Sequence, residues 1–184
     1  MTQETKPVQY ITVFGSSQAD DGGPLYNQAY DLGRLLAQCG FEVISGGYGG
    51  TMEGVSRGAR EAGGQAVGIT LATFDRWHRR SNAWLSAEHK SEDYLARVGE
   101  LTRRASGFVA LKGGIGTLSE VSITLSLLQV GEMAAKPLVL LGECWEPYLK
   151  VIREQFVLRP GDLSLVYLAP DAAQAAAWLR SSIA

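Results

Sequence analysis

Two glycine-rich stretches decide the fold of this chain: Ser45-Gly46-Gly47-Tyr48-Gly49-Gly50-Thr51-Met52-Glu53 and Leu111-Lys112-Gly113-Gly114-Ile115-Gly116-Thr117-Leu118-Ser119-Glu120. Each stretch follows a short apolar run that is typical of a buried strand, and each leads into a helix-like segment. A strand, a glycine turn and a helix N-terminus together form an anion site, because glycine lets the backbone approach a phosphate and free N–H groups face it. Two such turns favour a nucleotide-type ligand that is held from two sides.

Outward from these turns, short β-branched runs alternate with amphipathic segments. Strands are predicted at 10–14, 41–45, 66–70, 107–111, 137–141 and 165–168. Helices are predicted at 25–38, 51–62, 91–104, 117–130, 148–156 and 171–180, with Ser91 as a candidate cap of the third. Segment 73–90 has no clean period and is predicted to be a long loop with room for one short strand.

The alternation of strand and helix, without any hairpin signal, calls for parallel βαβ units. We therefore predict an α/β fold: a Rossmann-like open parallel sheet with helices on both faces, built as a single domain over residues 1–184. Ligands of such sheets bind outside the carboxyl ends of the strands, where the strand order reverses. The turns expected to converge there carry Ser16 and Ser17; Gly46, Gly47, Gly49, Gly50, Thr51 and Met52; and Gly113, Gly114, Ile115, Gly116 and Thr117.

Composition narrows the possible partners. The 184 residues are 46% hydrophobic, as in a globular protein, and the net charge of −2 gives no general basic field that would hold nucleic acid. The one cationic cluster lies at 76–80. Because the N-terminus is polar and no apolar run is long enough to span a bilayer, we expect neither a signal peptide nor a membrane segment. Cys39 and Cys144 lack metal-ligand spacing, so we expect a reduced cytoplasmic protein without a metal.

The two turns also exclude some familiar sites. Neither has the G-x-G-x-x-G spacing of a dinucleotide site, and neither has the G-x-x-x-x-G-K-[ST] pattern of a P-loop. Either turn alone could be a plain tight connection between a strand and a helix. Glu120 has two interpretations: with Thr117 it fits a capping box at the start of a helix, or it acts as a general base or stabilises positive charge on a ribose. Spacing alone leaves both open.

These residues resemble the Lonely Guy family of cytokinin-activating phosphoribohydrolases, many of which were long labelled lysine decarboxylases. The family pairs a P-G-G-x-G-T-x-x-E motif with a G-G-x-x-G-x-M turn, which stand here at 112–120 and 46–52. The opening strand that ends in Val13-Phe14-Gly15-Ser16-Ser17 is also similar to that family, as are Tyr26 and the segment 54–59. The similarity runs from about residue 10 to residue 130 and continues weakly to the C-terminus.

The resemblance implies a catalytic pair, Arg97 and Glu120, which match the family's arginine and the final glutamate of its motif. Four neighbouring positions depart from the family pattern: Lys112, Val98, Ser106 and Ser119. No lysine stands in a setting that suggests a pyridoxal phosphate enzyme, so lysine decarboxylation is not expected.

The resemblance implies hydrolysis of the N-glycosidic bond of an AMP-like or cytokinin-like nucleoside 5′-monophosphate, which yields free base and ribose 5-phosphate. The 5′-phosphate is expected on the second glycine turn, with no cofactor and no metal. The alternative is a non-catalytic nucleotide carrier, such as the related molybdenum-cofactor carriers. The family also implies a homodimer formed through helices near the site; the apolar helix at 117–130 fits that expectation, although burial in the core explains it equally well.

Overall fold

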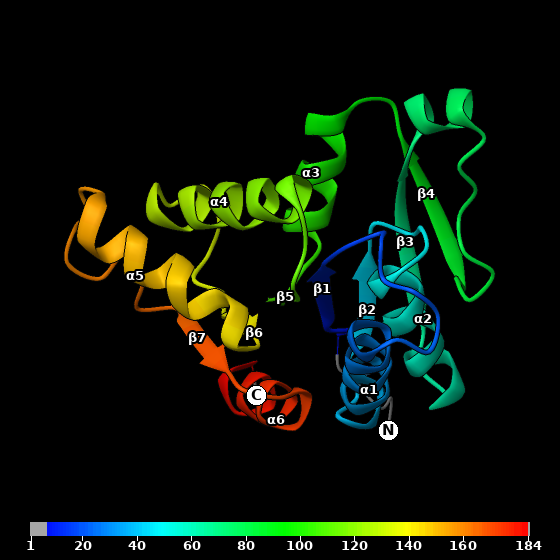
Figure 1. The fold of residues 1–184 in the computed structure, drawn as a ribbon, viewed down its shortest axis with the longest axis horizontal. Coiled ribbons are helices and arrows are strands. Elements are labelled where there is room, and N and C mark those ends of the chain that lie inside the picture. Colours follow the sequence, from blue (N-terminus) through cyan, green and yellow to red (C-terminus); the bar gives the residue numbers. More distant parts are fainter. Residues whose placement is uncertain (1–6, 184) are drawn as a thin grey trace, which may run out of the picture.

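The computed structural model describes residues 7–183, whose strands form one parallel sheet flanked by helices (Figure 1). The strands are β1 (Tyr10–Phe14), β2 (Glu42–Ser45), β3 (Ala66–Leu71), β4 (Ala87–Ser91), β5 (Gly107–Ala110), β6 (Leu138–Leu141) and β7 (Val166–Ala169). The helices are α1 (Pro24–Gln38), α2 (Thr51–Glu61), α3 (Tyr94–Arg103), α4 (Ile115–Gln129), α5 (Glu146–Gln155) and α6 (Ala172–Ile183), with two short 3₁₀ helices, η1 (Ala72–Trp77) and η2 (Glu143–Trp145). The predicted Rossmann-like α/β architecture is confirmed.

The order of the strands places the candidate site. The sheet runs β4-β3-β2-β1-β5-β6-β7, so the direction of winding reverses between β1 and β5. Val13 pairs with Ser45 and Phe14 pairs with Ala110, so the carboxyl ends of β1, β2 and β5 lie level. The segments that follow these three strands therefore start at one edge of the sheet, where open α/β sheets bind ligands.

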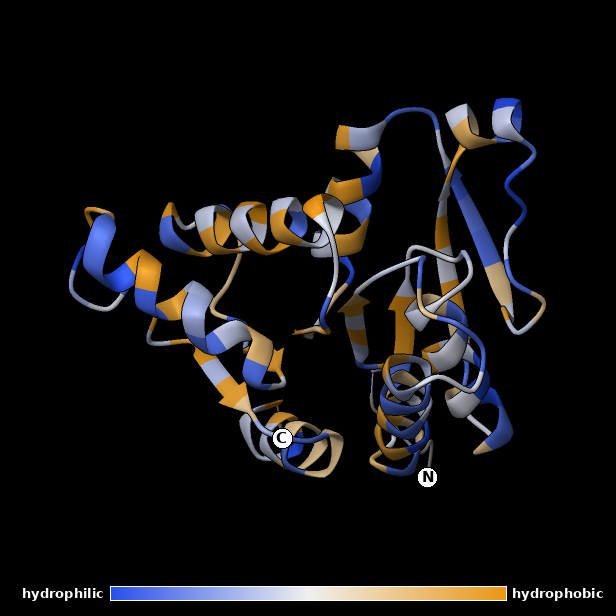
Figure 2. Ribbon diagram, in the orientation of Figure 1, coloured by the Kyte–Doolittle hydropathy of each residue, from blue (hydrophilic) through white to orange (hydrophobic). Residues whose placement is uncertain are grey.

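Alternate side chains of each strand pack against the two helical layers. Ile11 and Val13 of β1 belong to the core beneath α1, α2 and α6, whereas Phe14 belongs to the core beneath α3, α4 and α5. The inner strands are accordingly buried and largely apolar, as buried parallel strands must be, whereas the edge strand β4 is mostly hydrophilic and exposed (Figure 2). The two layers are visible on either side of the sheet in Figure 1.

Three glycines bring α1 and α2 into close contact. A Cβ atom at Gly54 would lie 2.7 Å from the carbonyl oxygen of Tyr26, and one at Gly58 would collide with the carbonyl of Tyr30. Gly33 of α1 likewise faces the backbone of α2. Because α2 begins at the first glycine turn, this contact fixes the position of that turn.

The structure corrects two of the predicted helix starts. Segment 73–90, predicted as a long loop with room for one short strand, contains η1 and most of β4, and β4 completes the edge of the sheet through five paired residues. Ser91 is the last residue of β4 and not a cap; the cap of α3 is Asp93, whose carboxylate accepts a hydrogen bond from the backbone N–H of Ala96 at 2.9 Å. The helix predicted from residue 117 begins at Ile115, because Gly114 is extended and serves as its N-cap.

No helix within residues 7–183 combines the length and apolarity that a membrane span requires.

Candidate functional site

A cavity of about 260 Å³ lies at the carboxyl ends of β1, β2 and β5. Both glycine turns and the segment after β1 contribute to its wall. The predicted site residues that line it are Ser16, Ser17, Gly46, Met52, Arg97, Gly114, Gly116, Thr117 and Glu120. The structure therefore brings together the arginine, the glutamate and parts of all three turns.

Arg97 is a buried arginine whose guanidinium is held by backbone carbonyls. Its Nε donates to the carbonyl oxygen of Ile69 at 2.7 Å, and its Nη2 donates to that of Gly46 at 3.3 Å. The helix that carries Arg97 is itself fixed, because the hydroxyl of Thr12 on β1 donates to the carbonyl of Leu101 at 2.7 Å. The guanidinium is thus oriented before any ligand arrives.

Glu120 faces Arg97 across the cavity floor. The carboxylate Oε1 lies 3.5 Å from Arg97 Nη1, and each residue is 7% exposed. Burial raises the pKa of the Glu120 carboxyl to about 7, and the adjacent Arg97 opposes that rise. A carboxyl group with a pKa near neutrality in a cavity is suited to moving a proton.

The position of Glu120 in α4 excludes one of its two interpretations from the sequence, the capping box. With the helix beginning at Ile115, Thr117 is the third helical residue and Glu120 lies in the second turn. The predicted capping box is therefore wrong: no acidic residue lies in the first turn, and Gly114 makes no side-chain cap. Glu120 points into the cavity because residues 117, 120, 121 and 124 form the buried stripe of α4.

The start of α4 combines backbone N–H groups that lack helix partners with open space. Its first hydrogen bond in the helix runs from the N–H of Leu118 to the carbonyl of Gly114, which leaves the preceding N–H groups without helix partners. A Cβ atom at Gly114 or at Gly116 would meet no heavy atom within 4 Å. These glycines therefore leave space above the helix N-terminus, where the dipole favours a negative charge.

Other predicted residues lie outside the cavity wall. Ile115 is 79% exposed, and Gly113 lies against the side chain of Thr117. In the first turn, Gly47 packs on Gly68, and Gly50 packs on the carbonyl of Ser16.

Thr51 and Gly49 complete the first turn. Thr51 ties that turn to the segment after β1, since its backbone N–H donates to the carbonyl of Ser16 at 2.9 Å. Gly49 lines a neighbouring hollow rather than the main cavity.

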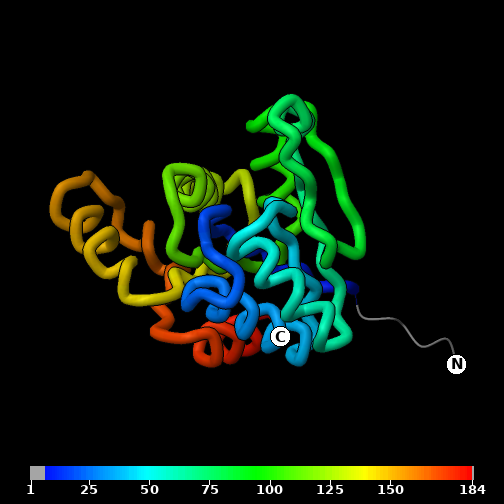
Figure 3. Tube along the Cα trace, turned by 45° about the vertical axis from the view of Figure 1, so that its right-hand side comes forward, coloured from blue at the N-terminus to red at the C-terminus, as the bar shows by residue number. Residues whose placement is uncertain are grey.

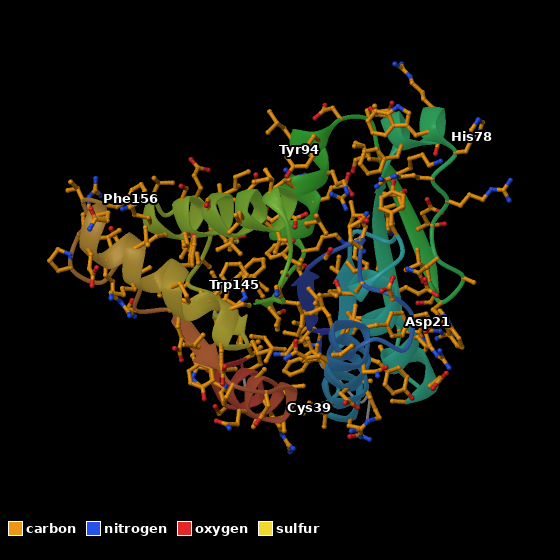
Figure 4. All side chains as sticks on the ribbon, in the orientation of Figure 1. Asp21, Cys39, His78, Tyr94, Trp145 and Phe156 are labelled. Carbon is orange, nitrogen blue, oxygen red and sulfur yellow. The ribbon has the colours of Figure 1, made fainter. Side chains whose placement is uncertain are left out.

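The sequence did not identify several residues of the wall: Gln18, Tyr48, Phe74, Arg79 and Tyr94. Tyr94 lies three residues before Arg97, a spacing that places both on one face of a helix, so the signal was present. Burial raises the pKa of the Tyr94 hydroxyl, and the charge of Glu120 adds to the rise. Figure 4 labels Tyr94 at the start of α3.

The four departures from the family motif do not line the cavity. Val98 is 2% exposed and packs in the core, and the hydroxyl of Ser119 donates to the carbonyl of Ile115 within its own helix. Lys112 lines a separate hollow beside Trp145. None of these four residues lines the cavity itself, although Ser119 lies within hydrogen-bond reach of the wall residue Tyr94.

Comparison with known proteins places the chain in a family. The profile of the SLOG cluster4 family matches residues 8–155. The chain belongs to that family. A cytokinin riboside 5′-monophosphate phosphoribohydrolase of Rhodococcoides fascians is 28% identical over 93% of this chain and 89% of that protein. A probable enzyme of the same name from Oryza sativa is 28% identical over 88% of this chain and 73% of that protein. The resemblance to the Lonely Guy family is confirmed.

Solved structures support the same fold. The molybdenum cofactor binding protein of Rippkaea orientalis superposes with a TM-score of 0.75 at 24% identity, over 98% of this chain and 100% of that one. The molybdenum cofactor carrier protein of Chlamydomonas reinhardtii gives a TM-score of 0.70 at 23% identity, over 95% of this chain and 98% of that one. Because both identities are low, these two comparisons show only that the chain shares the fold of these proteins.

Proposed function

We propose that this protein hydrolyses the N-glycosidic bond of a nucleoside 5′-monophosphate, releasing the free base and ribose 5-phosphate. The observation that carries the proposal is the buried pair of Arg97 and Glu120, 3.5 Å apart, in the same cavity as the open N-terminus of α4. The relatives named as cytokinin riboside 5′-monophosphate phosphoribohydrolases support the same reaction class.

In this proposal each group of the cavity has a distinct role. The N–H groups at the start of α4 and the hydroxyl of Thr117 hold the 5′-phosphate. Glu120, as a carboxylate, deprotonates the attacking water or stabilises the positive charge that develops on the ribose as the bond to the base breaks. Arg97 orients Glu120 and offsets the charge that develops during the reaction. Water supplies the hydroxyl group that remains on C1 of the ribose, and the departing base takes the proton.

The main alternative is a carrier that binds a nucleotide or the molybdenum cofactor without cleaving it. Two solved structures of similar fold are a molybdenum cofactor binding protein and a molybdenum cofactor carrier protein, and an open cavity serves a carrier as well as an enzyme. A buried carboxyl with a pKa near 7 favours the enzyme, because a carrier has no need of a group that exchanges a proton near neutrality.

One experiment separates the two functions. Pure protein is incubated with a panel of purine and pyrimidine nucleoside 5′-monophosphates, and ribose 5-phosphate is measured by mass. We expect release from at least one purine nucleotide, and none from the matching nucleosides, which lack the phosphate. A protein that binds AMP but releases ribose 5-phosphate from no monophosphate would be a carrier.

We also propose that two copies associate through α4. Ile115 and Val130, at its two ends, are 79% and 65% exposed, and Leu118 is 37% exposed, so burial within one chain does not account for the apolar character of this helix. Figure 2 shows apolar positions along α4 and the neighbouring α5. Light scattering should give the mass of two chains, and Val130→Asp should shift it toward one. A wild-type mass of one chain would contradict the proposal.

A further inference from the structure

A pair of arginines, Arg79 and Arg80, stands at the outer end of the cavity. They follow η1, which together with the approach to β4 projects from the body of the protein (Figure 3). Arg79 lines the main cavity, and both arginines line a second hollow of about 230 Å³ beside it. The two spaces share Ser17, Gln18, Tyr48 and Arg79, so they are neighbours across Arg79.

The segment that carries these arginines is fastened to the first glycine turn. The backbone N–H of Asn82 donates to the carbonyl of Gly47 at 2.9 Å, and its side-chain amide donates to the carbonyl of Tyr48 at 3.0 Å. Tyr48 is fixed in turn, since its hydroxyl accepts the backbone N–H of Leu71 at 2.8 Å. The backbone that follows the two arginines is therefore anchored beside Tyr48, while both arginine side chains remain exposed.

The backbone at the end of η1 directs Arg79 inward. His78 adopts a left-handed conformation with a φ of 51°, and the chain then turns so that the N–H of Arg79 donates to the carbonyl of Phe74 at 3.2 Å. The guanidinium of Arg79 lies 5.3 Å from the centroid of the Phe74 ring, a cation–π distance. Figure 4 labels His78 at this outer corner of the molecule.

Within residues 7–183, neither arginine forms an ion pair, although carboxylates lie on the same segment and on the adjacent strand. Asp75 is engaged by Lys90 at 2.7 Å. Glu88 accepts hydrogen bonds from the hydroxyls of Thr70 and Ser81, at 2.6 and 2.8 Å. Two guanidinium groups thus remain available to an anion at the rim, and guanidinium is well matched to carboxylate or phosphate.

The order of surfaces along the cavity indicates which part of a ligand reaches them. The phosphate cradle at the start of α4 belongs to the main cavity, and no residue of α4 lines the second hollow. Tyr48 and Phe74 line the main cavity with their rings 5.2 Å apart and tilted by 50°, and Tyr48 also lines the second hollow. Such rings suit a purine base. A nucleotide with its phosphate on α4 and its base beside these rings therefore directs the base toward Arg79 and Arg80.

We propose that Arg79 and Arg80 form a second anion subsite, so that the preferred ligand is a nucleoside 5′-monophosphate whose base carries a further carboxylate or phosphate group. This inference rests on the proposed nucleotide site and deepens it by naming the substrate class. It assigns a use to an arginine pair that the hydrolysis of a plain monophosphate does not need.

The test compares affinities by calorimetry for AMP, for AMP with a succinyl group on its N6 amine, for ADP and for adenosine 3′,5′-bisphosphate. We expect the wild-type protein to bind the N6-succinyl nucleotide at least tenfold more tightly than AMP. The double variant Arg79→Gln with Arg80→Gln should reduce that ratio to about one. Arg76→Gln, which removes a charge from η1 outside both spaces, should retain it.

Three results would overturn the inference: equal affinities for AMP and the N6-succinyl nucleotide, a preference that survives in the double variant, or a stronger preference for ADP or the 3′,5′-bisphosphate. The last result would place the second anion on the phosphate or the ribose rather than on the base. Because the readout is a ratio of affinities, it does not require cleavage. If the protein never releases ribose 5-phosphate, the proposed hydrolysis is contradicted. The affinity ratio still tests the second anion subsite in that case.

Discussion

The two glycine turns look alike in the sequence and serve different purposes in the structure. In the first turn the glycines are required by contacts within the protein: a Cβ at Gly46 would collide with the guanidinium of Arg97, and one at Gly50 would collide with the carbonyl of Ser16. In the second turn only Gly113 is required in this way, by the side chain of Thr117, whereas a Cβ at Gly114 or Gly116 would meet open space. The first turn therefore positions the arginines of the site, and the second leaves space for a ligand.

The comparison shows that a glycine motif has two physical meanings. Gly47 and Gly50 have φ values of 79° and 68°, which side chains rarely adopt, so their conformation alone demands glycine. Gly114 has a φ of −98°, which any residue tolerates. A glycine that neither the backbone nor the packing requires is better explained by something that binds beside it.

The largest expected effect tests the second turn. Gly114→Val adds a branched side chain in the space assigned to the phosphate, while the backbone conformation tolerates it. We expect the variant to remain folded by circular dichroism and to lose AMP binding altogether in thermal shift measurements. A folded variant that binds AMP like the wild type would show that this turn is structural, like the first.

The next effect compares the carboxylates that follow the two turns. Glu120→Gln keeps the shape of the side chain and removes its charge, so cleavage should fall by about 10²-fold or more, the usual scale for a positioned acid–base group. AMP affinity should change little, because the phosphate is held by backbone N–H groups. Glu53→Gln, at the corresponding start of α2 and outside the cavity, is the matched control and should cleave normally. Equal activity of the two variants would remove Glu120 from the mechanism.

A smaller effect concerns stability. Gly50→Ala forces a side chain onto a backbone with a φ of 68° and onto the carbonyl of Ser16, so the free energy of unfolding should fall by about 2 kcal/mol. Gly116→Ala adds its methyl group to open space within a helix and should raise stability by up to about 1 kcal/mol. Urea unfolding measures both. Similar losses in the two variants would contradict the distinction between the turns.

The last prediction concerns the dependence of kcat/KM on pH. The proposed reaction needs Glu120 as a carboxylate, and its pKa is raised to about 7, so the reactive form is lost as pH falls through that value. We expect kcat/KM to be level above about pH 8 and to fall about tenfold for each unit of pH below 7. A profile that stays level down to pH 5 would indicate that this carboxyl has an ordinary pKa or takes no part in the reaction.

The amino-acid sequence by itself determined the class of fold and the position of the glycine turns. Through the family resemblance it also named Arg97 and Glu120 as the candidate catalytic pair. Strand and helix periodicity are local properties, and apolar runs separated by amphipathic helices admit few arrangements other than a parallel sheet. The motif at 112–120 carried the resemblance to the Lonely Guy family. Even the misplaced start of α4 followed from a local rule, since Thr117 and Glu120 have the spacing of a capping box, and only the extended backbone of Gly114 overrides it.

Only the tertiary structure decided how Arg97, Glu120 and the two glycine turns affect one another. The burial that raises the pKa of Glu120 depends on α3, α4 and the sheet meeting around one carboxyl, and no spacing in the sequence records such a meeting. The opposite roles of the two turns also depend on distant neighbours, since Gly46 faces Arg97, 51 positions away along the chain. Long-range packing also brings Arg79 to the cavity wall, whereas the place of Tyr94 follows from its helical spacing to Arg97 once Arg97 is known to line the cavity.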